Sequence, residues 1–240
     1  MKQFNWQGHE WITQERWGQF HPDKPIVWYD PDAVVFPYEG VLDTISLKCR
    51  PNPNLFMTDK GNVEVPIGVG LISCKTKFGY GKFEIKAKLP SGPYVWPAFW
   101  MWAFDSWPPE IDVFEGYTNK RGSYFNWSLR SLIGKFWAVN SNIHLGETPN
   151  NYNLGAKSHW LGWKSPDKVF NRYGLVWNEN EITILFNDKI VRKITDEKTL
   201  SQFRGKKMNV IINNSIQDGY LKTDMPENEM IVKYFKYTTQ

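Results

Sequence analysis

Short stretches in which apolar and polar residues alternate recur along most of this chain. Phe83–Leu89 is one of them, and it ends at the turn-forming residues Pro-Ser-Gly-Pro. Because the side chains of a strand point to its two faces in turn, this period places the apolar residues on one face of a sheet. Good amphipathic helices are hard to find, and we expect at most a short one between Asp196 and Phe203. The pattern predicts an all-β sandwich.

The same pattern continues without a break to the end of the chain. A length of 240 residues, of which 41% are hydrophobic, is typical of one globular domain, and no linker or repeat divides it. We therefore expect residues 1–240 to form a single domain. Its later strands are predicted at 173–177, 181–186, 189–194, 209–214 and 230–237, with turns at Asn178-Glu179-Asn180 and Asn187-Asp188.

The hexapeptide Glu-Ile-Asp-Val-Phe-Glu at 110–115 places three acids on one predicted strand. Glu110 and Asp112 share a face, whereas strict alternation would send Glu115 into the core. An ionised glutamate in a core is costly. A β-bulge near Val113–Phe114 would return Glu115 to the face of the other two acids, and bulges are common beside active sites. We therefore predict a bulge there.

Such a row of acids is suited to breaking a glycosidic bond. With the bulge, Glu110 and Glu115 lie about four strand steps apart, or about 13 Å between Cα atoms. Carboxyls that lean together approach the ~5–5.5 Å of a retaining glycosidase rather than the ~6.5–9.5 Å of an inverting one. Asp112 is placed to share a proton with Glu110. A solvated strand face and a Ca²⁺ site also fit the hexapeptide alone, but the flanking Trp-Pro-Pro and Gly-Tyr favour an active site.

Composition excludes several classes of function. No stretch of 18 apolar residues exists, and the net charge of +4 is spread out, so we expect neither a membrane nor a nucleic-acid partner. The chain has no His or Cys cluster with metal-ligand spacing and no phosphate-binding glycine loop, so we expect no metal and no cofactor. Cys49 and Cys74 could pair, although two free buried thiols are the expected state. We expect a monomer.

Aromatic residues are unusually frequent, with 13 Trp, 11 Tyr and 15 Phe making up 16% of the chain. Flat aromatic rings with polar edges can bind the apolar faces of sugars. Trp96 and Trp100 share a strand face with the small Ala98 between them, and Trp107 precedes Glu110 by three residues. Each of these tryptophans could instead belong to the core, because Trp is largely buried on average.

These motifs together resemble glycoside hydrolase family 16. The resemblance covers about residues 30 to 237 and is carried by the following motifs in order: Tyr80-Gly-Lys-Phe-Glu84, Leu89-Pro90, Trp96-Pro-Ala-Phe-Trp-Met101, Glu110-Ile-Asp-Val-Phe-Glu115, Tyr173-Gly-Leu-Val-Trp177 and the final strand 230–237. It implies a concanavalin A-like β-jelly roll of two curved antiparallel sheets with a concave substrate cleft. The two residues between Asp112 and Glu115 are similar to the branch with laminarinases, agarases and carrageenases.

The resemblance also implies roles for individual residues. Glu110 matches the nucleophile, Asp112 the assisting acid and Glu115 the general acid/base. The residues expected to bind sugar are Trp96, Trp100, Trp107, His144 and Asn213. Two departures are visible: a longer segment 116–141 that carries Arg121, Trp127, Arg130, Lys135 and Trp137, and Lys233 where relatives place a calcium-binding Asp. We expect remodelled sugar subsites and no structural calcium through that position.

The expected function is a retaining endo-β-glycanase that hydrolyses a polysaccharide of the β-1,3-glucan or β-galactan type. A transglycosylase of the same family and a non-catalytic glycan-binding module are the alternatives. Such an enzyme meets its polymer outside the cell, although the start Met-Lys-Gln-Phe-Asn-Trp lacks the apolar core of a secretion signal. A mature secreted form, a phage or viral product and a cytosolic protein all stay open.

Overall fold

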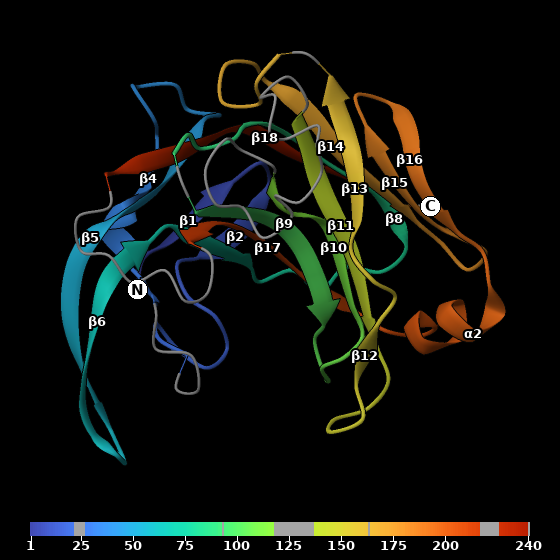
Figure 1. Ribbon diagram of the computed structural model, residues 1–240, viewed down its shortest axis with the longest axis horizontal. Helices are drawn as coiled ribbons and strands as arrows, with labels where there is room; N and C mark the ends of the chain where they lie inside the picture. The colour runs from blue at the N-terminus through green and yellow to red at the C-terminus, as the bar shows by residue number, and fades with distance from the viewer. Residues whose placement is uncertain (22–26, 93, 118–136, 163, 217–225, 240) are drawn as a thin grey trace.

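The computed structural model describes residues 1–21, 27–92, 94–117, 137–162, 164–216 and 226–239 (Figure 1). The predicted remodelling of the sugar subsites by Arg121, Trp127, Arg130 and Lys135 falls outside these ranges. None of the helices in the described ranges has the length and apolar character needed to cross a membrane.

Two curved sheets lie one over the other and make up most of the molecule (Figure 1). The first sheet contains, in spatial order, β1 (Gln3–Trp6), β2 (His9–Ile12), β7 (Leu71–Cys74), β17 (Met208–Ile216), β9 (Val95–Ala103), β10 (Glu110–Tyr117), β11 (Trp137–Leu145) and β12 (Tyr152–Asn153), with β13 (Lys157–Gly162) also paired to β11. The second contains β16 (Lys189–Ile194), β15 (Ile182–Phe186), β14 (Asn171–Trp177), β8 (Gly81–Lys88), β18 (Asn228–Thr239), β5 (Ile45–Thr58), β6 (Gly61–Val69) and β3 (Val27–Tyr29), with β4 (Val34–Val35) beside β5.

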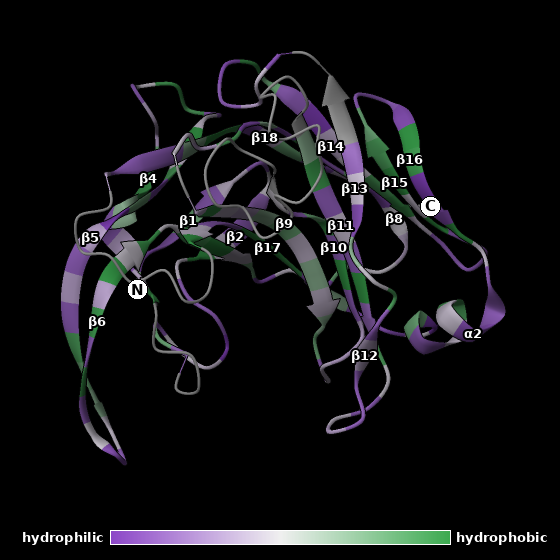
Figure 2. Cartoon of the chain, viewed as in Figure 1, coloured by the Kyte–Doolittle hydropathy of each residue, from purple (hydrophilic) through white to green (hydrophobic). Residues whose placement is uncertain are grey.

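The core lies between the two sheets and is built from the apolar residues that alternate with polar ones along the strands. Residues coloured green and purple follow one another along many strands in Figure 2, as expected where one face of each strand is buried. Phe114 of β10 packs on Tyr173 of β14, with ring centroids 4.5 Å apart. Asn214 of β17 joins the sheets through its amide, which donates to the Leu47 carbonyl at 3.0 Å and to Asn228 Oδ1 at 2.9 Å.

The predicted all-β jelly roll is confirmed, and so are its predicted local features. Asp196 caps α2 (Glu197–Leu200) by accepting a hydrogen bond from the Thr199 N–H at 2.9 Å, and the 3₁₀ turn η2 (Ser201–Phe203) follows. A second 3₁₀ turn, η1, spans Pro31–Ala33. The turn at Asn187-Asp188 has φ values of 45° and 67°, a conformation that Asn and Asp tolerate. Both cysteines are free and buried, as expected.

Candidate active site

The strand β10 contains the predicted bulge. Between Asp112 and Glu115, β10 advances by three residues while its neighbour β11 advances by two, from Asn142 to Asn140. The pairing with β9 slips between Asp112 and Phe114. Phe114 is fully buried in the core. The bulge therefore keeps Glu115 on the side of the first sheet that carries Glu110 and Asp112, here called the acid face.

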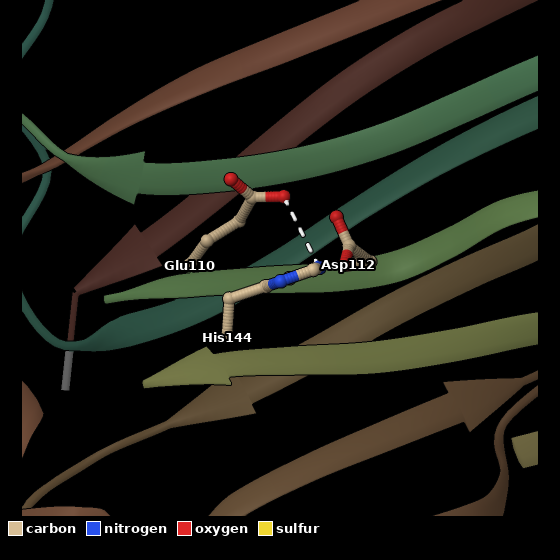
Figure 3. A group of neighbouring side chains, drawn as sticks. All are labelled: Glu110, Asp112 and His144. Atoms are coloured by element: carbon tan, nitrogen blue, oxygen red, sulfur yellow. Dashed lines mark ion pairs between the residues drawn. The ribbon is translucent and has the colours of Figure 1, made fainter. Parts of the chain in front are cut away.

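Glu110 and Asp112 meet His144, which lies on β11 directly opposite Glu110. His144 Nε2 is 3.3 Å from Asp112 Oδ2 and 3.8 Å from Glu110 Oε1, and Figure 3 shows the three side chains converging from the two strands. Trp107 Nε1 donates a hydrogen bond of 2.6 Å to Glu110 Oε2. Glu110 is thus held between an indole N–H and an imidazole.

Burial governs the charge of this pair of acids. It raises the pKa of Glu110 and the pKa of Asp112 well above their ordinary values. The Asp112 charge raises the pKa of Glu110 further. The hydrogen bond between the two carboxyls also raises the pKa of Glu110, but it lowers the pKa of Asp112. The charge of Glu115 is the second cause that raises the pKa of Asp112, after burial. The titrations of the three carboxyls therefore depend on one another.

Glu115 has a different environment from the other two acids. Its Oε1 accepts a long hydrogen bond of 3.4 Å from Asn142 Nδ2, which also lies 3.3 Å from His144 Nε2. Burial raises the pKa of Glu115, while the His144 charge and the Asn142 hydrogen bond lower it in part. A raised pKa suits a group that must begin the reaction protonated.

A buried cation lies behind the acids. Arg192, on β16 of the second sheet, is 6% exposed and donates from Nη1 to the Ser141 carbonyl at 3.0 Å and to Ser141 Oγ at 3.2 Å. Its charge lowers the pKa of Asp112 in part. Ser141 Oγ is also 2.6 Å from His159 Nε2, and burial is the main cause that lowers the pKa of His159 to about 4. His159 is therefore neutral near pH 7, whereas Arg192 is charged.

The three tryptophans expected to bind sugar lie around the acids. The Trp96 ring covers Gly116, where an added Cβ would lie 3.1 Å from it. Trp100 Nε1 donates a hydrogen bond of 2.8 Å to Asn213 Oδ1 on β17, which fixes the indole. Trp107 is 36% exposed. The structure therefore gathers on or beside the acid face all the residues that the sequence assigned to sugar binding, namely Trp96, Trp100, Trp107, His144 and Asn213.

A turn near the N-terminus also lies against the acid face. Glu15 and Gly18 exchange backbone hydrogen bonds of 3.2 and 2.9 Å. Glu15 is 1% exposed, and its pKa is raised to about 8, mainly by burial and in part by the charge of Glu110. The Arg16 guanidinium lies 3.9 Å from the centroid of the Trp102 ring, and Trp102 is opposite Glu110 on β9.

Sequence reasoning missed this turn, and it also missed Arg192 and Asn142. The signal that the sequence offered was the run Glu-Arg-Trp-Gly at 15–18, which places an acid, a base and an aromatic residue before a glycine. Arg192 and Ile194 are two residues apart on β16, so they point to the same face of the strand, and both are buried. Nothing in that pattern showed that its partner would be β11.

Glu110, Asp112 and His144 also have ligand atoms within 4.8 Å of one another, a spacing that one metal ion could occupy. The hydrogen bond from Trp107 to Glu110, and the raised pKa values of Glu110 and Asp112, instead fit a pair of carboxylic acids. We therefore assign the group to acid chemistry. The expectation that no metal takes part stays a prediction.

Comparison with known proteins gives a family. The model of the family "Glycosyl hydrolases family 16" matches residues 52–235. The chain is 22% identical to the endo-1,3-1,4-beta-glycanase EglC of Rhizobium meliloti over 78% of its own length and 38% of the relative's. It is 31% identical to the glucan endo-1,3-beta-glucosidase A1 of Niallia circulans over 55% of its own length and 18% of the relative's. The chain thus spans less than half the length of these curated relatives.

A solved structure from Bacteroides ovatus has the same fold. It is a family 16 enzyme from a mixed linkage glucan locus in complex with the product G4G4G3G, and it matches with a TM-score of 0.72 and 21% identity over 95% of this chain and 93% of that one. The family match covers most of the chain and includes every acid of β10. This chain belongs to glycosyl hydrolases family 16.

Proposed function

We propose that this chain is a retaining endo-β-glycanase and that residues 1–240 form its catalytic domain. The observation that carries the proposal is the bulged strand β10, which holds Glu110, Asp112 and Glu115 on one face. The names of the matched relatives favour β-1,3-glucan or mixed-linkage β-glucan over a β-galactan as the substrate.

The reaction would proceed in two steps. Glu110 attacks the anomeric carbon while Glu115 donates its proton to the leaving oxygen, and a glycosyl-enzyme forms on Glu110. Burial raises the pKa of Glu110, so the nucleophile must be ionised when it attacks, and the neighbouring Asp112 is the group placed to accept its proton. Water then enters, Glu115 takes its proton, and the sugar leaves with its original configuration.

Glycan-binding modules of this fold and transglycosylases are the alternatives, and one assay separates them. The wild-type protein is incubated with laminarin, mixed-linkage glucan, agarose, porphyran and carrageenans, and new reducing ends are measured. The proposal expects internal cuts in a β-glucan. Binding without new reducing ends would indicate a binding module, and products that lengthen when an oligosaccharide acceptor is added would indicate a transglycosylase.

Substitution of the nucleophile tests the roles of the acids. Glu110→Gln is expected to abolish hydrolysis while sugar binding persists, because the amide keeps the shape of the side chain and loses its nucleophilicity. Glu64→Gln, at an exposed position of β6, is the matched control and is expected to retain full activity. Proton NMR of the first products reports the anomer. Inverted products would contradict the predicted carboxyl separation, and hydrolysis by Glu110→Gln would contradict the assigned nucleophile.

A further inference from the structure

Arg16 is an exposed cation on the side of the acid face where the proposed nucleophile lies. Among the residues that the structure describes, its guanidinium makes no ion pair within 4 Å and no hydrogen bond to a side chain. The Arg16 charge acts at longer range on the buried Glu15, whose pKa it lowers in part. The guanidinium instead lies over the ring of Trp102 at 3.9 Å from the centroid. Its N–H groups are therefore available to a ligand.

The position of Trp102 places this stack on the acid face. Trp102 is opposite Glu110 across β9 and β10, so both side chains point to the same side of the sheet. Trp102 is nevertheless only 3% exposed. Arg16 covers its ring, and the Trp17 ring packs against it with centroids 5.5 Å apart. A ligand that approaches Glu110 from this side therefore meets the Arg16 guanidinium before it meets the indole.

The turn covers more of the acid face than Trp102 alone. Leu71 and Ile211 lie on the same face by register, since they are opposite Asn213 and Trp100. They are 2% and 0% exposed, and Trp17 packs against the cluster that contains them. This part of the sheet is thus closed to a sugar, and the exposed residue of the covering turn is Arg16.

We propose that Arg16 is a substrate-binding residue on the Glu110 side of the acid face, where its guanidinium, held over the Trp102 ring, donates hydrogen bonds to oxygen atoms of the bound sugar. The inference rests on the proposed function, which it extends to a further contact. A guanidinium is a planar fork of donors, and stacking on an indole fixes its orientation before the ligand arrives. Less rotational freedom is then lost on binding.

The oxygen atoms could belong to the hydroxyls of a neutral glucan or to a sulfate of a sulfated galactan. Both accept hydrogen bonds from a guanidinium, and the charged group accepts the stronger ones. The nearby acids Glu110, Asp112 and Glu115 repel a sulfate at short range, which favours the neutral sugar. The experiment below includes one arm for each source.

Binding is measured by calorimetry in the Glu110→Gln protein, so that bound sugar is not cut. The ligands are a β-1,3-glucan oligosaccharide, a mixed-linkage oligosaccharide and a sulfated galactan oligosaccharide. Arg16→Ala is expected to weaken binding of a neutral oligosaccharide by about tenfold to a hundredfold. Arg16→Lys is expected to recover little of it, because an ammonium lacks the planar fork. The matched control is Lys233→Ala, which removes from β18 of the second sheet a cation that lies 4.3 Å from the centroid of the Phe170 ring.

The outcomes separate this inference from the proposed function. The inference is overturned if Arg16→Ala, made in the Glu110→Gln protein, binds every ligand as tightly as the Glu110→Gln protein itself. It is also overturned if Lys233→Ala loses the same affinity, or if the Glu110→Gln protein binds none of the ligands. A loss confined to the sulfated ligand would support the contact and assign it to an anionic sugar. If the wild-type protein binds through Arg16 yet releases no new reducing ends, the proposed function fails and this inference stands. Thermal unfolding of each variant shows that it is folded.

Discussion

The hydrogen bond from Trp107 to Glu110 should set the acid limit of activity. Trp107→Phe keeps an aromatic ring but removes the N–H that donates to Glu110 Oε2 at 2.6 Å. A hydrogen bond to a charged group contributes about 1.5–3 kcal/mol, which corresponds to about 1–2 pKa units at ~1.36 kcal/mol per unit. Because the indole is 36% exposed, water replaces part of that contribution and the lower end applies. The N–H favours the ionised carboxyl, so its loss raises the pKa of Glu110.

The assay is the pH dependence of kcat/KM on the substrate identified by the reducing-end screen, since that ratio reports ionisations of the free enzyme. In the proposed mechanism the attack requires ionised Glu110, so the acid limb should move to higher pH by about one unit in Trp107→Phe. Trp100→Phe is the control, because the Trp100 N–H donates to Asn213 rather than to an acid. The reasoning is refuted if the acid limb of Trp107→Phe stays in place or moves to lower pH, or if Trp100→Phe shifts it equally.

Three predictions concern stability. The pKa of His159 is about 4 in the folded protein and 6.5 ordinarily, so this residue should lower the free energy of unfolding by up to about 3 kcal/mol as the pH drops from 6.5 to 4. In His159→Gln this contribution should be absent, so urea unfolding should show a smaller loss of stability over the same pH range than in the wild-type protein. The pKa of Glu15 is raised from 4.5 to about 8, so its stabilising contribution is present below pH 4.5 and is lost as the pH rises through 8. The free energy of unfolding of Glu15→Gln should therefore rise relative to that of the wild-type protein by up to about 5 kcal/mol between pH 4.5 and 9. Parallel pH profiles of the two proteins would contradict this. Asn214→Ala should lower the free energy of unfolding by about 1–3 kcal/mol at every pH, because the Leu47 carbonyl and Asn228 lose their donor inside the core; a variant as stable as the wild-type protein would show that the bridge between the sheets contributes nothing.

The acids of β10 were predictable because their placement depends on local rules. Alternation placed Glu110 and Asp112 together, and the cost of a buried charge at Glu115 required the bulge that the structure contains. The Trp96 and Trp100 positions followed from the same alternation on β9. These inferences need only the geometry of one strand, so the sequence alone carries them.

The N-terminal turn could not be placed in the same way. Arg16 and Trp102 are separated by more than eighty residues, and their contact depends on how the chain leaves β2 and crosses β7 and β17. The alternation of apolar and polar residues does not predict the path of a segment over a sheet. It indicates to which face of a strand a side chain points, but not which segment covers that face. The charge pattern gave no further help, because adjacent residues such as Glu15 and Arg16 interact wherever the turn lies and so do not indicate its position.

The arrangement of charge around β10 explains how one strand can hold three acids. Each carboxyl is buried, and burial raises the pKa of each. The charge of Glu115 raises the pKa of Asp112 further, whereas the interaction with Glu110 and the charge of Arg192 lower it. Arg192 lies on β16 of the second sheet and reaches the first sheet through its hydrogen bond to the Ser141 carbonyl. The second sheet therefore takes part in setting the charge of the acid face, because it supplies a buried cation that favours the ionised form of Asp112.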